Sequence, residues 1–159
     1  MKKVVSLLLM LVIACTMLTA CSDPVYDEFE NFLNVEMVDV NANYEKIKEE
    51  AGSWSNLTTD EEFITSLKDV LLPLVDDSLA KVNAIVLETE EVKVVRAKYV
   101  KVMERYKEGF TLILEGFEEQ SEEKLNEGND KITEAIELLD EYNAALEELA
   151  EQVGAEVEY

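Results

Sequence analysis

Two cysteines and 36 acidic side chains are the residues best suited to chemistry in this 159-residue chain, because it contains no histidine. Without histidine, a hydrolase would need a Ser-Lys pair or paired acids, and no serine has a recognisable nucleophile context. The Glu-x-x-Glu pairs Glu119/Glu122 and Glu148/Glu151 could face a metal ion, but we expect them on solvated helix surfaces. Residues 126–130 (NEGND) have the wrong order for a calcium loop. We therefore predict no enzyme, no metal site and no cofactor.

The first twenty residues have the order of an export signal. Lys2 and Lys3 give a positive start, an almost wholly apolar run follows to Met17, and small residues precede Cys21. The uncharged run over residues 4–22 is barely long enough to span a membrane, and no basic residue stops it. The sequence therefore predicts a cleaved signal peptide over residues 1–20.

The four residues Leu18-Thr19-Ala20-Cys21 resemble the lipobox of bacterial lipoproteins. In that family the cysteine thiol is alkylated with diacylglycerol, the chain is cut before the cysteine, and the new amino terminus is often acylated. The resemblance covers residues 1–21. It implies cleavage between Ala20 and Cys21, a lipidated Cys21 with a tether over residues 21–23, and an extracytoplasmic protein anchored to the cell membrane. Ser22 leaves an outer-membrane position open for a host with two membranes.

Removal of the signal would change both cysteine content and charge. Cys15 would leave with the signal, so that no disulfide could form in the mature chain. The remaining chain would carry 36 acidic and 12 basic residues, a net charge of −24. Such a surface repels nucleic acid and anionic lipid headgroups, so we expect no nucleic-acid partner. The covalent lipid, not charge, would hold the protein at a membrane.

Apolar residues recur at spacings of three and four in four segments of the mature chain, which predicts four helices. The first runs from Pro24 to Ala51, with Asp23 as its cap. Gly52 is expected to end it and to open a loop over residues 52–58. The second begins with the capping box of residues 59–62, and its stripe extends from Phe63 to Val86.

The third segment is expected to start after Thr89, and the fourth to follow a turn at residues 120–121 and to end at Gly154. Ile136 belongs to the apolar stripe of the fourth. Pro73 should kink the second segment or split it. A continuous helix through Thr89, paired with a second copy as a coiled coil, is the alternative; we favour a turn because residues 88–91 are polar.

Four segments of similar length with short connections predict an all-α fold, an antiparallel up-down-up-down four-helix bundle over residues 24–154. Such a bundle can bury its apolar stripes within one molecule, so we expect a monomer. Residues 155–159 form a short acidic tail.

Six basic residues fall within 15 positions of the third segment, opposite its apolar stripe. These residues are Lys93, Arg96, Lys98, Lys101, Arg105 and Lys107. They could dock an anionic polymer or protein. We favour the interpretation that they balance the acidic residues of the fourth segment.

Aromatic residues and Pro73 suggest further sites. Trp54, the single tryptophan, lies in the first loop, where it could contact a partner; we favour a lid over the end of the bundle. Four tyrosines lie on core stripes, with hydroxyls expected at the boundary: Tyr44, Tyr99, Tyr106 and Tyr142. A ligand cavity among them, or a pocket opened by Pro73, is the alternative to simple packing.

Together these features favour an acidic, lipid-anchored binding or structural module of the bacterial envelope. The mature part is similar in general to small helical envelope lipoproteins, and its partners would be the membrane, through Cys21, and an envelope protein. One alternative is a carrier of a small hydrophobic or aromatic ligand. Another is an inhibitor or immunity protein that acts on a basic partner.

Overall fold

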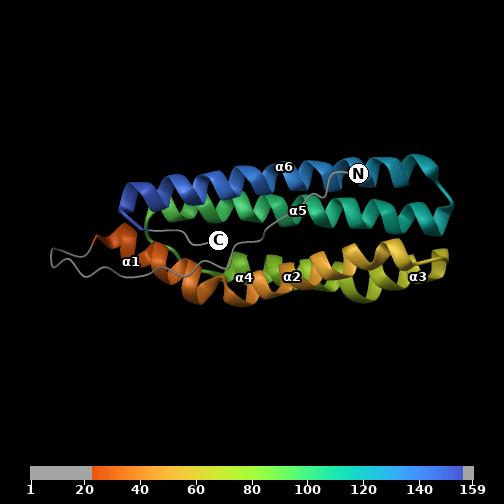
Figure 1. Cartoon of the computed structure of the whole chain (residues 1–159), viewed down its shortest axis with the longest axis horizontal. Coiled ribbons are helices and arrows are strands. Elements are labelled where there is room, and N and C mark those ends of the chain that lie inside the picture. The colour runs from red at the N-terminus through yellow and green to blue at the C-terminus, as the bar shows by residue number, and fades with distance from the viewer. Residues whose placement is uncertain (1–22, 156–159) are drawn as a thin grey trace.

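The computed structural model describes residues 23–155, and these residues are helical apart from short connections (Figure 1). The prediction of an all-α fold is therefore confirmed. The signal peptide, Ala20, Cys21 and the tail residues 156–159 lie outside the described range.

The first pass along the molecule contains α1 (Pro24–Asn31), the π-helical turn η1 (Phe32–Glu36) and α2 (Val38–Ser53). Asp23 caps α1 as expected, since its carboxylate accepts a hydrogen bond from the Val25 amide at 3.0 Å. The turn was not predicted. Phe29, Leu33 and Met37 are all buried and are spaced four residues apart. In an α-helix with 3.6 residues per turn, residues spaced four apart drift gradually around the helix and away from the core. A π-helical turn contains an additional residue, so these three side chains stay on the buried face.

The second pass contains the 3₁₀ turn η2 (Trp54–Asn56), α3 (Asp60–Thr65), the π turn η3 (Ser66–Leu71) and α4 (Leu72–Ala84). The capping box at Thr59 and Glu62 is confirmed. Pro73 does not split this pass: it lies in the first turn of α4, directly after η3. Its missing N–H is tolerated there, because the preceding turn is already bonded in the wider π pattern.

The third and fourth passes are the long helices α5 (Glu90–Glu119) and α6 (Glu122–Val153). Thr89 is the N-cap residue of α5, as predicted, and Gln120 turns the chain with a φ of 54°. Gly154 ends α6 with a φ of 73°, which confirms its predicted role. The same prediction for Gly52 was wrong: α2 continues through it to Ser53, and Gly52 has no left-handed φ.

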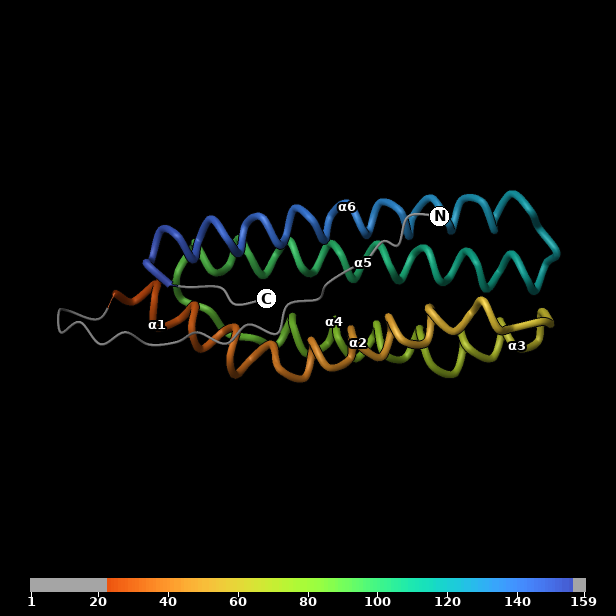
Figure 2. The backbone as a smooth tube through the Cα atoms, in the orientation of Figure 1, coloured from red at the N-terminus to blue at the C-terminus, as the bar shows by residue number. Residues whose placement is uncertain are grey.

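Residues 85–89 between α4 and α5 are not helical, so the continuous helix considered as an alternative does not form. Successive passes run in opposite directions along one long axis (Figures 1 and 2). The start of α1, the α4–α5 connection and the end of α6 lie at one end of the molecule. The η2 segment and the α5–α6 turn lie at the other end.

The interfaces between passes differ in extent. Helices α5 and α6 pack closely along their lengths, α2 packs on α4, and α4 packs on α5. Within residues 23–155, α2 and α6 have no comparable backbone contact. The pairs α5–α6, α2–α4 and α4–α5 are therefore packed extensively, and α2 and α6 are not.

Most residues of the predicted stripes form one buried core, including Phe29, Val40, Leu71 and Phe110. Two predicted core residues are exposed. Val86 is 89% exposed because it lies in the non-helical α4–α5 connection, and Ile136 is 49% exposed at the edge of the buried face of α6.

Candidate functional site

The predicted lipidation residue, Cys21, lies outside the described residues, and helix α1 follows it closely in the sequence. Helix α1 begins three residues after Cys21 and is capped by Asp23. Phe29 and, in the next turn, Phe32 are fully buried, so this first helical segment is part of the core. A group attached at Cys21 would therefore hold the molecule by the end that also contains the α4–α5 connection.

Glu28 links α1 to the start of α5 at this same end. Its carboxylate accepts hydrogen bonds from the Glu88 amide at 2.5 Å, from the Thr89 amide at 2.8 Å, and from the Thr89 hydroxyl. Burial raises the pKa of Glu28, but these hydrogen bonds and the charge of Lys93 outweigh burial and hold the pKa below its usual value. The Thr89 hydroxyl thus donates a hydrogen bond to Glu28 of α1, and it does not accept one from a backbone amide of α5. The sequence gives no signal for this pair, because 61 residues separate its members.

The six basic residues of α5 do not form one unpaired surface. Their contacts are Lys93–Glu90 at 2.8 Å, Lys98–Glu141 at 3.6 Å, Arg105–Glu108 at 2.7 Å, Arg105–Glu134 at 3.1 Å and Lys107–Asp76 at 2.7 Å. Arg96 donates instead to the carbonyl of Ile85 at 2.7 Å, and Lys101 is exposed. The partners come from α4, α5 and α6, which is the arrangement expected if these cations balance acidic neighbours.

Trp54 lies at the end of the molecule opposite α1. Its indole N–H donates to the Ser66 hydroxyl at 2.8 Å. The ring packs edge-on against Phe63 and Phe110, with centroid separations of 5.7 and 6.1 Å. These contacts join η2, α3 and α5, so Trp54 has the position expected of a lid.

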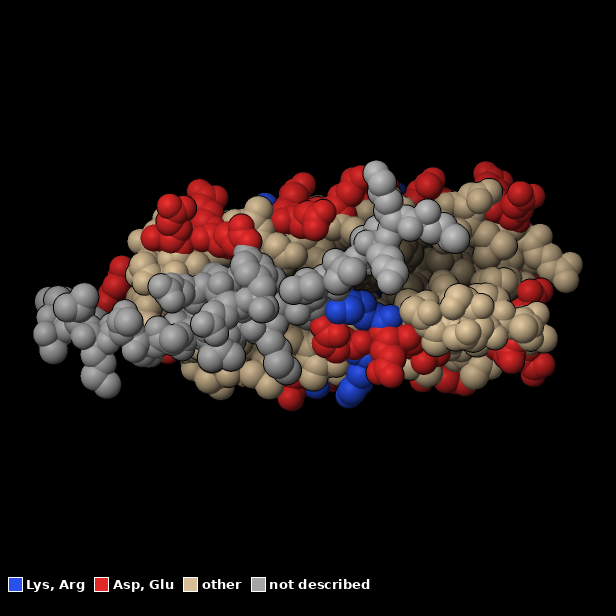
Figure 3. Space-filling view, viewed as in Figure 1, with Lys and Arg blue, Asp and Glu red and all other residues tan. Residues whose placement is uncertain are grey.

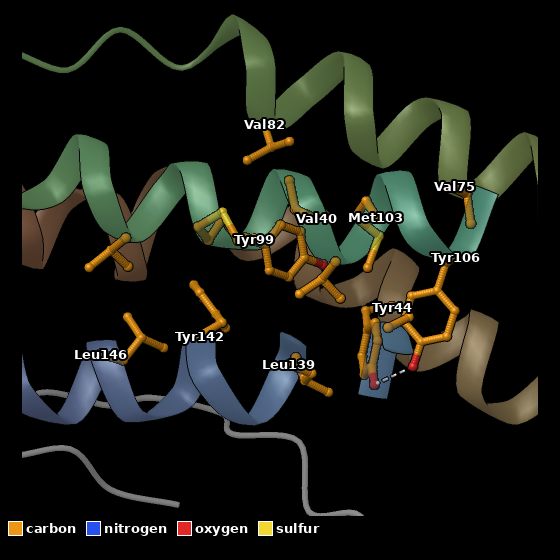
Figure 4. Packing of buried hydrophobic residues seen from close by; sticks show 14 of the residues in the cluster. Val40, Tyr44, Val75, Val82, Tyr99, Met103, Tyr106, Leu139, Tyr142 and Leu146 are labelled. Carbon is orange, nitrogen blue, oxygen red and sulfur yellow. Dashed lines mark hydrogen bonds between the residues drawn. The ribbon is translucent and has the colours of Figure 1, made fainter. Parts of the chain in front are cut away.

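The four tyrosines of the core stripes are buried and pack as two edge-to-face pairs (Figure 4). Tyr44 and Tyr106 have ring centroids 6.1 Å apart and hydroxyl oxygens 3.5 Å apart. Tyr99 and Tyr142 have centroids 5.1 Å apart. The hydroxyl of Tyr99 is buried with no hydrogen-bond partner among the described residues. The expectation that it reaches the boundary was therefore wrong, because α5 turns it toward the core.

These hydroxyls keep their protons at physiological pH. Burial, reinforced by the other tyrosines, raises the pKa of Tyr44 and of Tyr99 far above the usual value. Burial also raises the pKa of Tyr106, although its hydrogen bond with Tyr44 partly offsets that increase. Each phenol therefore keeps its O–H, which can donate a hydrogen bond while its oxygen can accept one.

Pro73 borders a surface hollow and not an internal pocket. The hollow has a volume of about 640 Å³ and is open to solvent between α2 and α4. Charged side chains surround it, including Lys46, Glu49, Glu50 and Asp69. An apolar ligand would find little buried surface there.

Over residues 23–155, no cluster of three or more Cys, Asp or Glu side chains is arranged to hold a metal ion. No helix in the same range combines the length and apolar character needed to cross a membrane.

No protein-family model matches the chain, and comparisons with curated proteins and with solved structures also find no match. A functional proposal therefore depends on the sequence motif at Cys21 together with the described residues that follow it.

Proposed function

We propose that this protein is a lipid-anchored, acidic helical module that binds a partner or ligand at the outer face of a bacterial membrane. Cys21 would carry the lipid, and the four passes would form a monomeric up-down-up-down four-helix bundle.

The observation that carries the proposal is the immediate succession of a lipobox and a capped, buried helix. Only Ser22 and Asp23 separate Cys21 from Pro24, a reach of roughly 7 Å when extended. Because Phe29 is fully buried, the first helix cannot serve as a free linker. The bundle would therefore start next to the bilayer, and partners would approach its sides or its distal end.

Lipidation can be tested with the two cysteines of the chain. We expect Cys21→Ser to abolish labelling by an alkyne fatty acid and to release the protein from the membrane fraction or leave it unprocessed. Cys15→Ser is the matched control, because Cys15 lies within the predicted signal and should leave both properties unchanged. Unaltered labelling and membrane retention in Cys21→Ser would refute the proposed anchor.

A further inference from the structure

Two adjoining hollows lie along the contact between the first and second passes. The hollow beside Pro73, between α2 and α4, has a volume of about 640 Å³, and a second hollow of about 400 Å³ lies beside α3. Glu50 and Val70 line both of them. The two hollows therefore form one groove that is open to solvent, which we call the Val70 groove.

The Val70 groove has one apolar wall and one polar wall. Val70 and Leu74 of the second pass line it and are partly buried, as is Leu57 in the segment before α3. Leu74 also packs against the core, which fixes its position. Helix α2 contributes only polar side chains to the lining: Lys46, Glu49, Glu50 and Ser53. An amphipathic helix, with one apolar and one polar face, has the pattern that matches these two walls.

The side chains around the Val70 groove carry an excess of negative charge. Asp77 is paired with Lys81, and Glu62 caps α3, so these two acids already have partners. Lys46 is the single cation in the lining. Four lining acids form no ion pair within residues 23–155: Glu49, Glu50, Glu61 and Asp69. A cationic partner would supply the missing ion pairs beside an apolar surface.

A hollow of similar size between α5 and α6 has a different charge pattern. Its volume is about 670 Å³, and Lys107 and Lys131 are among the side chains that line it. Lys107 contacts Asp76 at 2.7 Å, and Lys131 contacts Glu134 at 2.9 Å. Because the protein's own lysines lie in this second hollow, a cationic partner would gain less there than in the Val70 groove.

We propose that the Val70 groove binds an amphipathic, cationic helix of a partner protein. The apolar side chains of that helix would pack on Val70 and Leu74, and its lysine or arginine side chains would face the unpaired acids. The groove extends to α3, at the end of the molecule opposite α1 (Figure 1), so a membrane-anchored molecule would leave it accessible. This inference rests on the proposed binding role and adds the class of partner.

The test compares two short amidated peptides of leucine and lysine with identical composition. In one peptide the leucines share a helical face, and in the other the order is scrambled so that they do not. Both peptides carry the same charge, so general attraction to acidic side chains, which also cover the α6 edge (Figure 3), is the same for both. The chain from Ser22 onward contains the groove and the described core. Its folding is first checked by circular dichroism and by cooperative thermal unfolding.

Binding is followed by calorimetry and by the fluorescence of Trp54, because the peptides contain no tryptophan. The indole N–H of Trp54 donates to the Ser66 hydroxyl at 2.8 Å, and Ser66 lines the groove, so the emission of Trp54 reports on an occupant. In about 0.15 M salt, which screens distant charges, we expect the amphipathic peptide to bind at least about tenfold more tightly than the scrambled one. Burial of its leucine side chains is the reason.

Neutralisation of two groove acids tests the position of the site. The double substitution Glu49→Gln/Asp69→Asn should weaken binding of the amphipathic peptide about fivefold, because two ion pairs with the peptide are lost. The matched control Glu137→Gln/Glu147→Gln removes the same charge from exposed positions of α6. It should change the affinity less than about twofold.

Equal affinity of the unmodified chain for the two peptides would overturn the proposal, and this comparison requires no variant to fold. Equal losses from the groove and α6 substitutions would also overturn it, because general attraction to the acidic surface would then explain binding. Failure of the membrane anchor would appear only in cell fractionation, so the two proposals can fail independently.

Discussion

At the scale of single residues, the carboxylate of Glu28 stabilises a helix to which it does not belong. It accepts hydrogen bonds from two backbone amides and one hydroxyl at the start of α5. We expect Glu28→Gln to lower the free energy of unfolding at pH 7 by about 1 kcal/mol, as for loss of a helix cap. Urea unfolding of both proteins would measure the difference.

The pH dependence identifies the charge as the cause. Because folding depresses the pKa of Glu28, its contribution is complete above the unfolded pKa and disappears as the pH falls through the folded value. The stability gap between wild type and Glu28→Gln should therefore begin to narrow as the pH falls below the ordinary glutamate pKa of about 4.3, and it should close at still lower pH. Glu36→Gln, at an exposed position of η1, is the control and should change little. A gap that persisted unchanged at low pH would show that geometry, and not charge, matters.

At the scale of elements, glycines set the separation of α5 and α6. A Cβ atom added to Gly128 would lie 2.6 Å from Cγ1 of Ile113 and 2.8 Å from the carbonyl oxygen of Gly109. The backbone atom cannot move aside without separating the helices. We expect Gly128→Ala to destabilise the protein by about 1–3 kcal/mol, the usual cost of overpacking, measured by thermal and urea unfolding.

Gly52 provides the matched control, because a Cβ atom there would meet nothing within 4 Å. It lies within α2, where alanine is preferred over glycine, so Gly52→Ala should be neutral or stabilise by up to about 1 kcal/mol. Similar destabilisation by both substitutions would contradict a specific close approach at Gly128.

The spacing of apolar residues predicted the helices, because a helix that buries one face needs apolar residues every three or four positions. It placed Tyr99 and Tyr142 in the core, and local caps such as Asp23 and the capping box at Thr59 were readable from short motifs. The Glu28–Thr89 contact and the close approach of Gly109 to Gly128 could not be predicted from the sequence. Both depend on which helices become neighbours, and single-helix patterns do not contain that information.

At the scale of the whole molecule, the outcome of two opposing electrostatic effects decides how the protein responds to salt. Ion pairs such as Lys81–Asp77 and Lys107–Asp76 are at least partly exposed, and each contributes only about 0–1 kcal/mol. The excess of acidic over basic residues produces repulsion across the whole surface. General repulsion should therefore exceed the sum of the local attractions.

We accordingly expect the melting temperature of the chain from Ser22 onward to rise as sodium chloride increases from about 0.02 to 0.3 M, because salt screens the repulsion over distances near 10 Å. Glu137→Lys, at an exposed position of α6, should raise the melting temperature at low salt and flatten its salt dependence. Calorimetric melts of both proteins provide the measurement. A melting temperature that fell with salt would mean that the cations of α5 hold the acidic helices together more strongly than the excess charge drives them apart.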